Sequence, residues 1–254
     1  MYKVTERIYL VAKIVKYMCN ISIYKEIRLS IFIEQLKTVG PESIFIIAIT
    51  SFFISLVFTL QIVKEFLYLN AADLIGSILS LSFIHELSPV LTSIVIIGKI
   101  GSYFTSELAT MVLTEQIDAL YMLGINPIDY LIIPRILSVV LILPLLNLFS
   151  ILTSVMSSSF TCFILYNIHP QVFFISVYTS FSFIDIFKSS LKIMIFGFCI
   201  SIISCVFGVT TRGGSKGVGL STTSSVVVSL LFVFVLDFLL SYLMFNDKVN
   251  LIKI

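Results

Sequence analysis

Long runs of apolar residues recur along this chain with few charges inside them. A helix that crosses a bilayer needs about 20 consecutive apolar residues. Five segments come close to or exceed that length, and each holds at most one charge in its interior: 43–63, 86–107, 136–168, 193–211 and 226–245. The pattern predicts an all-α integral membrane protein with about five transmembrane helices.

Two of these spans have unusual features. The segment 136–168 is too long for one perpendicular crossing, so it must tilt, kink at Pro144 or continue beyond the bilayer. The segment 86–107 has glutamates at both ends, and at 1.5 Å per residue it covers about 31 Å, the thickness of the hydrocarbon core. The sequence leaves open whether the first span crosses fully or turns back as a re-entrant hairpin.

The N-terminal region has a different, amphipathic pattern. Its apolar residues fall on one side of a helical wheel, opposite Lys3, Lys13 and Lys16: Val4, Ile8, Val11, Val15 and Met18. Such a helix either lies in the membrane interface or packs on protein. We therefore expect an amphipathic interfacial region over 1–40 and a transmembrane domain over 41–254.

Composition supports a lipid environment. Hydrophobic residues make up 58% of the 254 residues and charged residues 12%, against about 45–50% and 25% in soluble domains. A single core of this size cannot hide that much apolar surface. The net charge of +2 gives no reason to expect nucleic acid as a partner.

No catalytic or metal-binding motif is found. The four cysteines form no CxxC pair, and His85 and His169 stand alone, so we expect no cofactor, no metal site and no enzymatic activity. The glycine-rich stretch 213–219 lacks the spacing of a phosphate-binding loop. We interpret it as a flexible cytosolic connection into the last span.

The distribution of Lys and Arg predicts the orientation. Positive residues collect on the cytosolic side of membrane proteins. Residues 1–40 are rich in them, 211–224 hold Arg212 and Lys216, and 167–184 hold none. This places the N-terminus, the connection 112–135 and the loop 211–224 on the cytosolic or stromal side, with the C-terminus outside.

The connection 112–135 contains a second short helix. Thr114 is a plausible N-cap, Glu115 and Asp118 suit the first turn, and Gly124 with Pro127 supply stop signals. The pattern predicts a helix of about ten residues, too short to cross. It is either a surface that an ATPase grips or an interfacial connector.

With this segment, the chain resembles the MlaE permease family. The members of this family are the membrane subunits of ABC-type lipid transporters in bacterial inner membranes and plastid envelopes. The likeness covers nearly everything after residue 30 and is most specific over 115–127. Further matching segments are 34–35, 39–40, 85–91, 98–102, 107–111, 134–135, 185, 188–189, 211–214, 217–219, 222–223 and 237–238. The family usually has Arg at the positions of His85 and Lys99, and Gly at that of Ser88.

The resemblance implies a homodimer that binds a separate ABC ATPase subunit and an MCE-domain lipid-binding protein. It implies that the complex moves phospholipid or a related glycerolipid between membranes, and that these residues couple to the ATPase: Thr114, Glu115, Gln116, Ile117, Asp118 and Leu120. The absence of Trp and the abundance of Ile, Phe, Ser and Lys are typical of proteins encoded by an AT-rich genome, such as that of a plastid. This composition favours a plastid (chloroplast) envelope, with a bacterial inner membrane as the alternative. An ion-coupled secondary transporter with Glu86, Lys99 and Glu107 as a relay is the alternative function, although no internal duplication supports it.

Charges inside the spans are candidates for the lipid path. Lys99, Tyr103 and Glu107 recur at four-residue steps on one helix side, and a charge at such depth normally faces protein or water. We expect Glu86, Lys99, Tyr103 and Glu107 to line the headgroup route. For Lys99, a structural ion pair between helices is an equal alternative.

For other polar residues in the spans we expect structural roles. Asp185, Lys188 and Lys192 share a helix side and are expected to snorkel towards an interface. Asp237 needs a partner that the sequence does not identify. Ser150, Ser154 and Ser158 recur every four residues, which predicts close helix packing.

Overall fold

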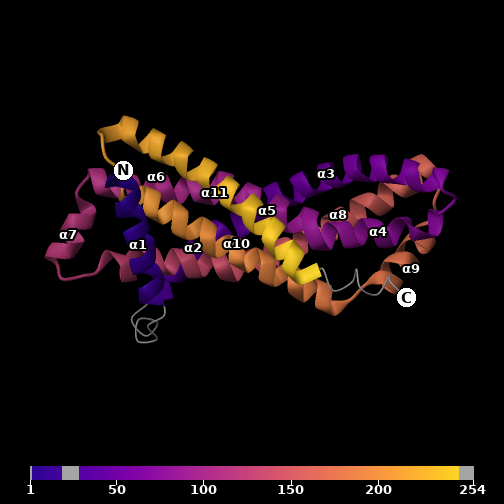
Figure 1. The fold of residues 1–254 in the computed structure, drawn as a ribbon, viewed down its shortest axis with the longest axis horizontal. Coiled ribbons are helices and arrows are strands. Elements are labelled where there is room, and N and C mark those ends of the chain that lie inside the picture. The colour runs from indigo at the N-terminus through magenta and orange to yellow at the C-terminus, as the bar shows by residue number, and fades with distance from the viewer. Residues whose placement is uncertain (1, 19–28, 246–254) are drawn as a thin grey trace. The chain divides into compact units, whose positions relative to one another are not determined.

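A computed structural model describes residues 2–18 and 29–245, and in that part of the chain every regular element is helical. Figure 1 traces the elements in order. Five helical stretches are long and apolar enough to cross a membrane, at 30–68, 72–113, 128–166, 183–209 and 214–244. The predicted fold class and the number of spans are therefore confirmed. The predicted position of the C-terminus concerns residues 246–254, which lie outside the described residues.

The spans are built from helices of very different regularity. The first consists of α2 (Leu29–Val39) and α3 (Pro41–Tyr68), a single 28-residue helix, so the possible re-entrant hairpin is not formed. The second is α4 (Ile75–Ser82), α5 (Ser88–Ile96) and α6 (Ser102–Leu113), preceded by the 3-10 turn η2 (Ala72–Leu74). One-turn π-helices, η3 (Phe83–Leu87) and η4 (Ile97–Gly101), join its three pieces.

The remaining helices complete the element order. The π-turn η5 (Ile128–Ile132) leads into α8 (Ile133–Tyr166), which continues through Pro144 as one 34-residue helix. Then follow α9 (Pro170–Ser180), α10 (Phe183–Val209) and α11 (Gly214–Phe245). The interpretation of 213–219 as a flexible connection is wrong from Gly214 onward. Gly213 and Gly214 have φ of 102° and 68° and allow the chain to turn, and α11 begins at Gly214 itself.

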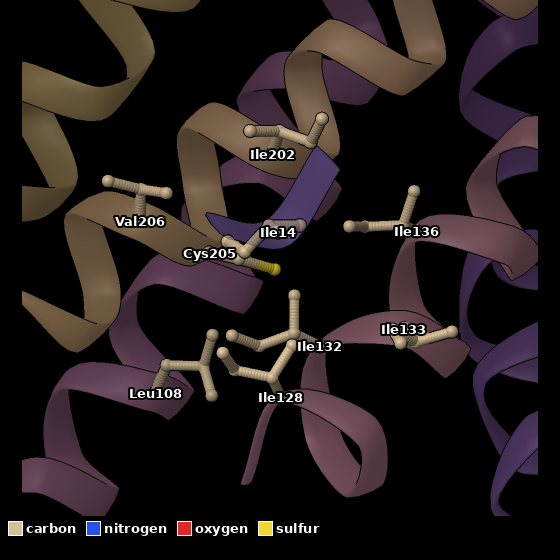
Figure 2. Packing of buried hydrophobic residues seen from close by; sticks show 9 residues of the cluster. All are labelled: Ile14, Leu108, Ile128, Ile132, Ile133, Ile136, Ile202, Cys205 and Val206. Atoms are coloured by element: carbon tan, nitrogen blue, oxygen red, sulfur yellow. The ribbon is translucent and has the colours of Figure 1, made fainter. Parts of the chain in front are cut away.

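Contacts divide the chain into two compact units. The first comprises 1–42, 94–143 and 194–235, and the second comprises 43–93, 144–193 and 236–254. The core of the first unit joins α1 (Tyr2–Met18) to α6, η5, α8 and α10, and Figure 2 shows its nine buried residues around Ile14 and Cys205. Leu10, Val11, Tyr17 and Met18 of α1 also pack against it.

The apolar stripe expected on α1 is therefore only partly correct. Val11 and Met18 pack on the core as expected, but Ile8 is 64% exposed and Ile14, outside the expected stripe, is fully buried. The buried strip of α1 is centred on Ile14 because this side of the helix faces α10 and η5. The helix thus packs on protein, one of the two alternatives left open, while Ile8 and Tyr9 remain exposed.

The second unit contains a hydroxyl-rich seam between α3 and α8. Ser51 Oγ contacts Ser150 Oγ at 2.7 Å, and Thr59 Oγ1 donates to Ser158 Oγ at 2.9 Å. Both pairs are separated by 99 residues. A constant offset means that the two helices run in parallel, so the stretch between them crosses once. Ser150, Ser154 and Ser158 are fully buried, which confirms their predicted packing role.

Gly76 allows α4 to contact α9 closely in the second unit. A Cβ at this position would lie 2.5 Å from the carbonyl oxygen of Phe173 and closer still to Ser176 Oγ. We expect Gly76→Ala to lower the free energy of unfolding by about 1–3 kcal/mol, because α9 must shift. Gly98→Ala is the matched control, since nothing lies within 4 Å of its Cβ. Thermal unfolding in one detergent checks this, and equal melting temperatures for the two variants would contradict it.

Candidate transport and coupling sites

A cluster of charged groups connects three helices of the second unit. Lys192 of α10 is completely buried, and its Nζ lies 2.9 Å from Glu86 Oε2 of η3 and 2.6 Å from Asp237 Oδ1 of α11. It also donates to Ser241 Oγ at 2.7 Å and to the carbonyl oxygen of His85 at 3.0 Å. Three hydrogen-bond acceptors and the nearby Asp237 carboxylate compensate for the removal of this ammonium from water.

This cluster supplies the missing partner of Asp237, and it corrects one expectation. Lys192 does not snorkel towards an interface, because its ammonium is held between carboxylates from two other helices. Asp185 is also buried, and its Oδ1 lies 3.5 Å from His85 Nε2. Lys188 is half-buried and donates to the carbonyl oxygen of Met244.

Glu86 occupies a special position within the cluster. It lies on the π-turn η3, and π-turns inside helices often occur at functional sites. Its side chain is 46% exposed although it contacts a buried ammonium, and Ser241 Oγ donates to Glu86 Oε2 at 3.1 Å. A half-exposed carboxylate within a span requires a watery cavity or a polar partner on its open side.

The other three lipid-path candidates lie in the first unit. Lys99, on the π-turn η4, has its Nζ 3.7 Å from Glu42 Oε2 at the start of α3. Glu107 Oε2 lies 2.8 Å from Arg135 Nη2, and Tyr103, between Lys99 and Glu107 on the same helix side, is 42% exposed. The ion pair that was one alternative for Lys99 is thus present. A role in the lipid path for these residues stays a prediction.

Arg135 lies in the matching segment 134–135 but is not among the predicted site residues. It is 2% exposed, and its guanidinium lies 5.6 Å from the centre of the Phe104 ring. Its position directly after Pro134, at the start of a long uncharged run, is the signal that could have identified it. A charged side chain at the edge of such an uncharged run needs a partner that compensates for its removal from water.

The short helix between the second and third spans is α7 (Gln116–Met122). Thr114 is not its N-cap: Thr114 ends α6, and its Oγ1 donates to the carbonyl oxygen of Thr110 at 3.0 Å. The cap is Glu115, whose φ of 57° turns the chain between the two helices. The helix is therefore seven residues long rather than about ten, because residues 114–115 form the turn between α6 and α7.

The expected stop signal of α7 is confirmed. Gly124 has a φ of 76°, and the amide of Ile125 donates to the carbonyl oxygen of Leu120 at 3.0 Å. This is the left-handed glycine termination typical of helix ends. Ile117 is buried while Tyr121, Met122 and Leu123 are exposed, Met122 by 89%. The exposed side chains of Tyr121, Met122 and Leu123 thus form an apolar tip at the end of α7, and the first turn of the helix is polar.

The segments predicted to lie on the cytosolic side are close together in the first unit. Arg212 Nη2 lies 3.0 Å from Glu6 Oε1, and Arg7 Nε donates to Thr210 Oγ1 at 3.1 Å. A cavity of about 210 Å³ has walls from α1, α6, α7, η5 and α10, with Lys13 and Asp118 in its lining. The N-terminal helix, α7 and the loop before α11 therefore belong to one end of this unit.

The described helices and their buried interhelical charges fit a multi-pass helical membrane protein. Residues 32–243 match the family model described as Permease MlaE, and the chain belongs to this family of ABC transporter permeases.

Several relatives have related descriptions. The chain is 52% identical over 214 residues to the "Probable ABC transporter permease protein ycf63" of Pyropia yezoensis, with 84% of this chain and 81% of that protein covered. It is 47% identical to a "Probable ABC transporter permease protein" of Synechocystis sp., with the same coverage. It is also 43% identical over 221 residues to "Protein TRIGALACTOSYLDIACYLGLYCEROL 1, chloroplastic" of Arabidopsis thaliana, covering 87% of this chain and 63% of that protein.

Proposed function

We propose that this chain is the membrane subunit of an ABC-type transporter that moves phospholipid or a related glycerolipid between membranes. The observation that carries the proposal is the family match over 32–243. The name of the Arabidopsis relative contains that of a glycerolipid, which supports a lipid as the substrate. A transporter built from this chain takes its energy from ATP hydrolysed by a separate subunit.

The proposed assembly contains two copies of the chain, each bound to one ATPase subunit at α7. An exposed apolar tip next to exposed Glu115 and Asp118 suits a partner groove with an apolar floor and a polar rim. An MCE-domain lipid-binding protein would bind on the opposite side of the membrane. The chloroplastic Arabidopsis relative favours a plastid envelope, and the Synechocystis relative keeps a bacterial inner membrane as the alternative.

Reconstitution tests the energy source. The chain is placed in lipid vesicles with its ATPase subunit, and transfer of a fluorescent phospholipid to acceptor vesicles is followed. We expect transfer to require hydrolysable ATP and to be unaffected when proton and sodium gradients are dissipated. Transfer driven by an ion gradient without ATP would instead support the ion-coupled carrier.

Lys99 tests the proposed headgroup route, which also includes Glu86, Tyr103 and Glu107. Lys99→Met keeps the apolar stem and removes the charge, and we expect ATP-driven lipid transfer to fall about tenfold, the effect of ~1.4 kcal/mol on a barrier. Stability should change by less than about 1 kcal/mol, because the pair with the exposed Glu42 is long and screened. Lys64→Met, at an exposed lysine near the end of α3, is the control. Normal transfer by a stable Lys99→Met complex would refute the path role.

A further inference from the structure

The helix α9 of the second unit has an exposed surface that is apolar and carries no charge. One side packs on α4 through Phe173 and Ser176, which are buried. Its other sides expose Ile175 by 64% and Tyr178 by 83%. The whole connection 167–184 contains no Lys, Arg, Asp or Glu. An ordinary water-facing helix has a charged face, whereas the exposed polar side chains of α9 are only the uncharged Gln171 and Thr179.

The same surface continues onto a membrane span. Phe183, Ile184 and Phe187 at the start of α10 are exposed by 84%, 65% and 64%. An open groove lies between α9 and this start, and all of its lining residues are uncharged: Pro170, Gln171, Phe174, Ile175, Val177, Tyr178, Thr179, Phe181 and Phe183. A docking surface for a soluble protein normally has a polar, partly charged rim. Continuity with the outer face of α10 favours lipid as the occupant.

The length of α9 determines how it can lie in the bilayer. Eleven residues cover about 16 Å, half of the hydrocarbon thickness, so the helix cannot cross. It follows α8, which separates it from α7 by one crossing. If α7 is cytosolic, α9 is on the other side.

We propose that α9 and the apolar residues that follow it are immersed in the non-cytosolic leaflet, with lipid acyl chains filling the groove between α9 and the start of α10. Tyr178, an amphipathic aromatic residue, is positioned to reach the headgroup region, as aromatic residues in interfacial belts do.

The absence of tryptophan from the chain allows a direct test. A Tyr178→Trp variant of the full chain is reconstituted in phosphatidylcholine vesicles with or without bromine on the acyl chains. The control is Tyr68→Trp at the end of α3, which has a similar exposure of 88% but lies between Glu65 and Asp73. We expect brominated lipid to lower the emission of the Tyr178→Trp variant about twofold, as for a side chain at the boundary between headgroups and acyl chains, and that of the control much less.

Acrylamide, a quencher dissolved in water, completes the experiment. It should quench the Tyr68→Trp variant more strongly than the Tyr178→Trp variant. Strong acrylamide quenching of the Tyr178→Trp variant would overturn the proposal, because α9 would then face water. Protection from both quenchers would also overturn it, because a second copy of the chain would then cover the surface. Neither measurement needs ATP or the ATPase, so the outcome is independent of the proposed transport function.

Discussion

Replacing Lys192 with methionine should destabilise the protein by several kcal/mol. The variant leaves the carboxylates of Glu86 and Asp237 around the space vacated by the ammonium, with no positive charge between them. Removing one partner from a buried ion pair typically costs about 3–5 kcal/mol. Thermal unfolding of the purified protein in a single detergent measures the loss.

Lys99→Met is the matched control for that experiment. The substitution is chemically the same, but Lys99 has one 3.7 Å contact with a carboxylate that is 61% exposed. Exposed pairs of this kind contribute about 0–1 kcal/mol. Similar melting temperatures for the two variants would show that the Lys192 cluster does not hold the helices together.

A rescue variant separates lost charge balance from lost packing. Adding Glu86→Gln and Asp237→Asn to Lys192→Met makes the cluster uncharged while keeping the size of its side chains. Because neutral replacements of buried ion networks are often tolerated, we expect most of the stability to return. If the triple variant were as unstable as Lys192→Met, the aliphatic stem of Lys192 would be the important part.

Reversing the charges of Glu115 and Asp118 should abolish coupling without unfolding the membrane subunit. Both side chains are exposed, at the cap and in the first turn of α7. An interface that fits two carboxylates would meet two ammonium groups in Glu115→Lys/Asp118→Lys, and like charges brought together cost several kcal/mol. We expect at least about a tenfold loss of ATPase binding, equivalent to ~1.4 kcal/mol. Lipid transfer should fall to background.

Co-purification with the ATPase and lipid transfer measure this effect. A suitable control is Glu65→Lys/Asp73→Lys, which reverses two exposed carboxylates in the second unit. Met122→Ser tests the apolar tip separately and should weaken ATPase binding without any change of charge. Intact assembly and transfer by Glu115→Lys/Asp118→Lys would contradict docking at α7.

Much of this architecture could be predicted because its causes are local. The cost of placing polar groups in lipid acts on each segment by itself, so the five spans follow from runs of apolar residues. The end of α7 also has a local cause, since Gly124 adopts the left-handed conformation that ends the helix. The buried serines of α8 also follow from spacing, because small residues four apart form one strip.

The sequence alone therefore determined the membrane class, the number of crossings and the position of the short connecting helix. Only the tertiary structure decided which charges meet. Glu86 and Lys192 are 106 residues apart, and their contact depends on the rotation of α10 about its axis and on the π-turn that carries Glu86. The same applies to the buried strip of α1 and to Glu115 as the cap of α7. Helix rotation and capping depend on neighbouring elements, whereas transfer into lipid depends mainly on the segment itself.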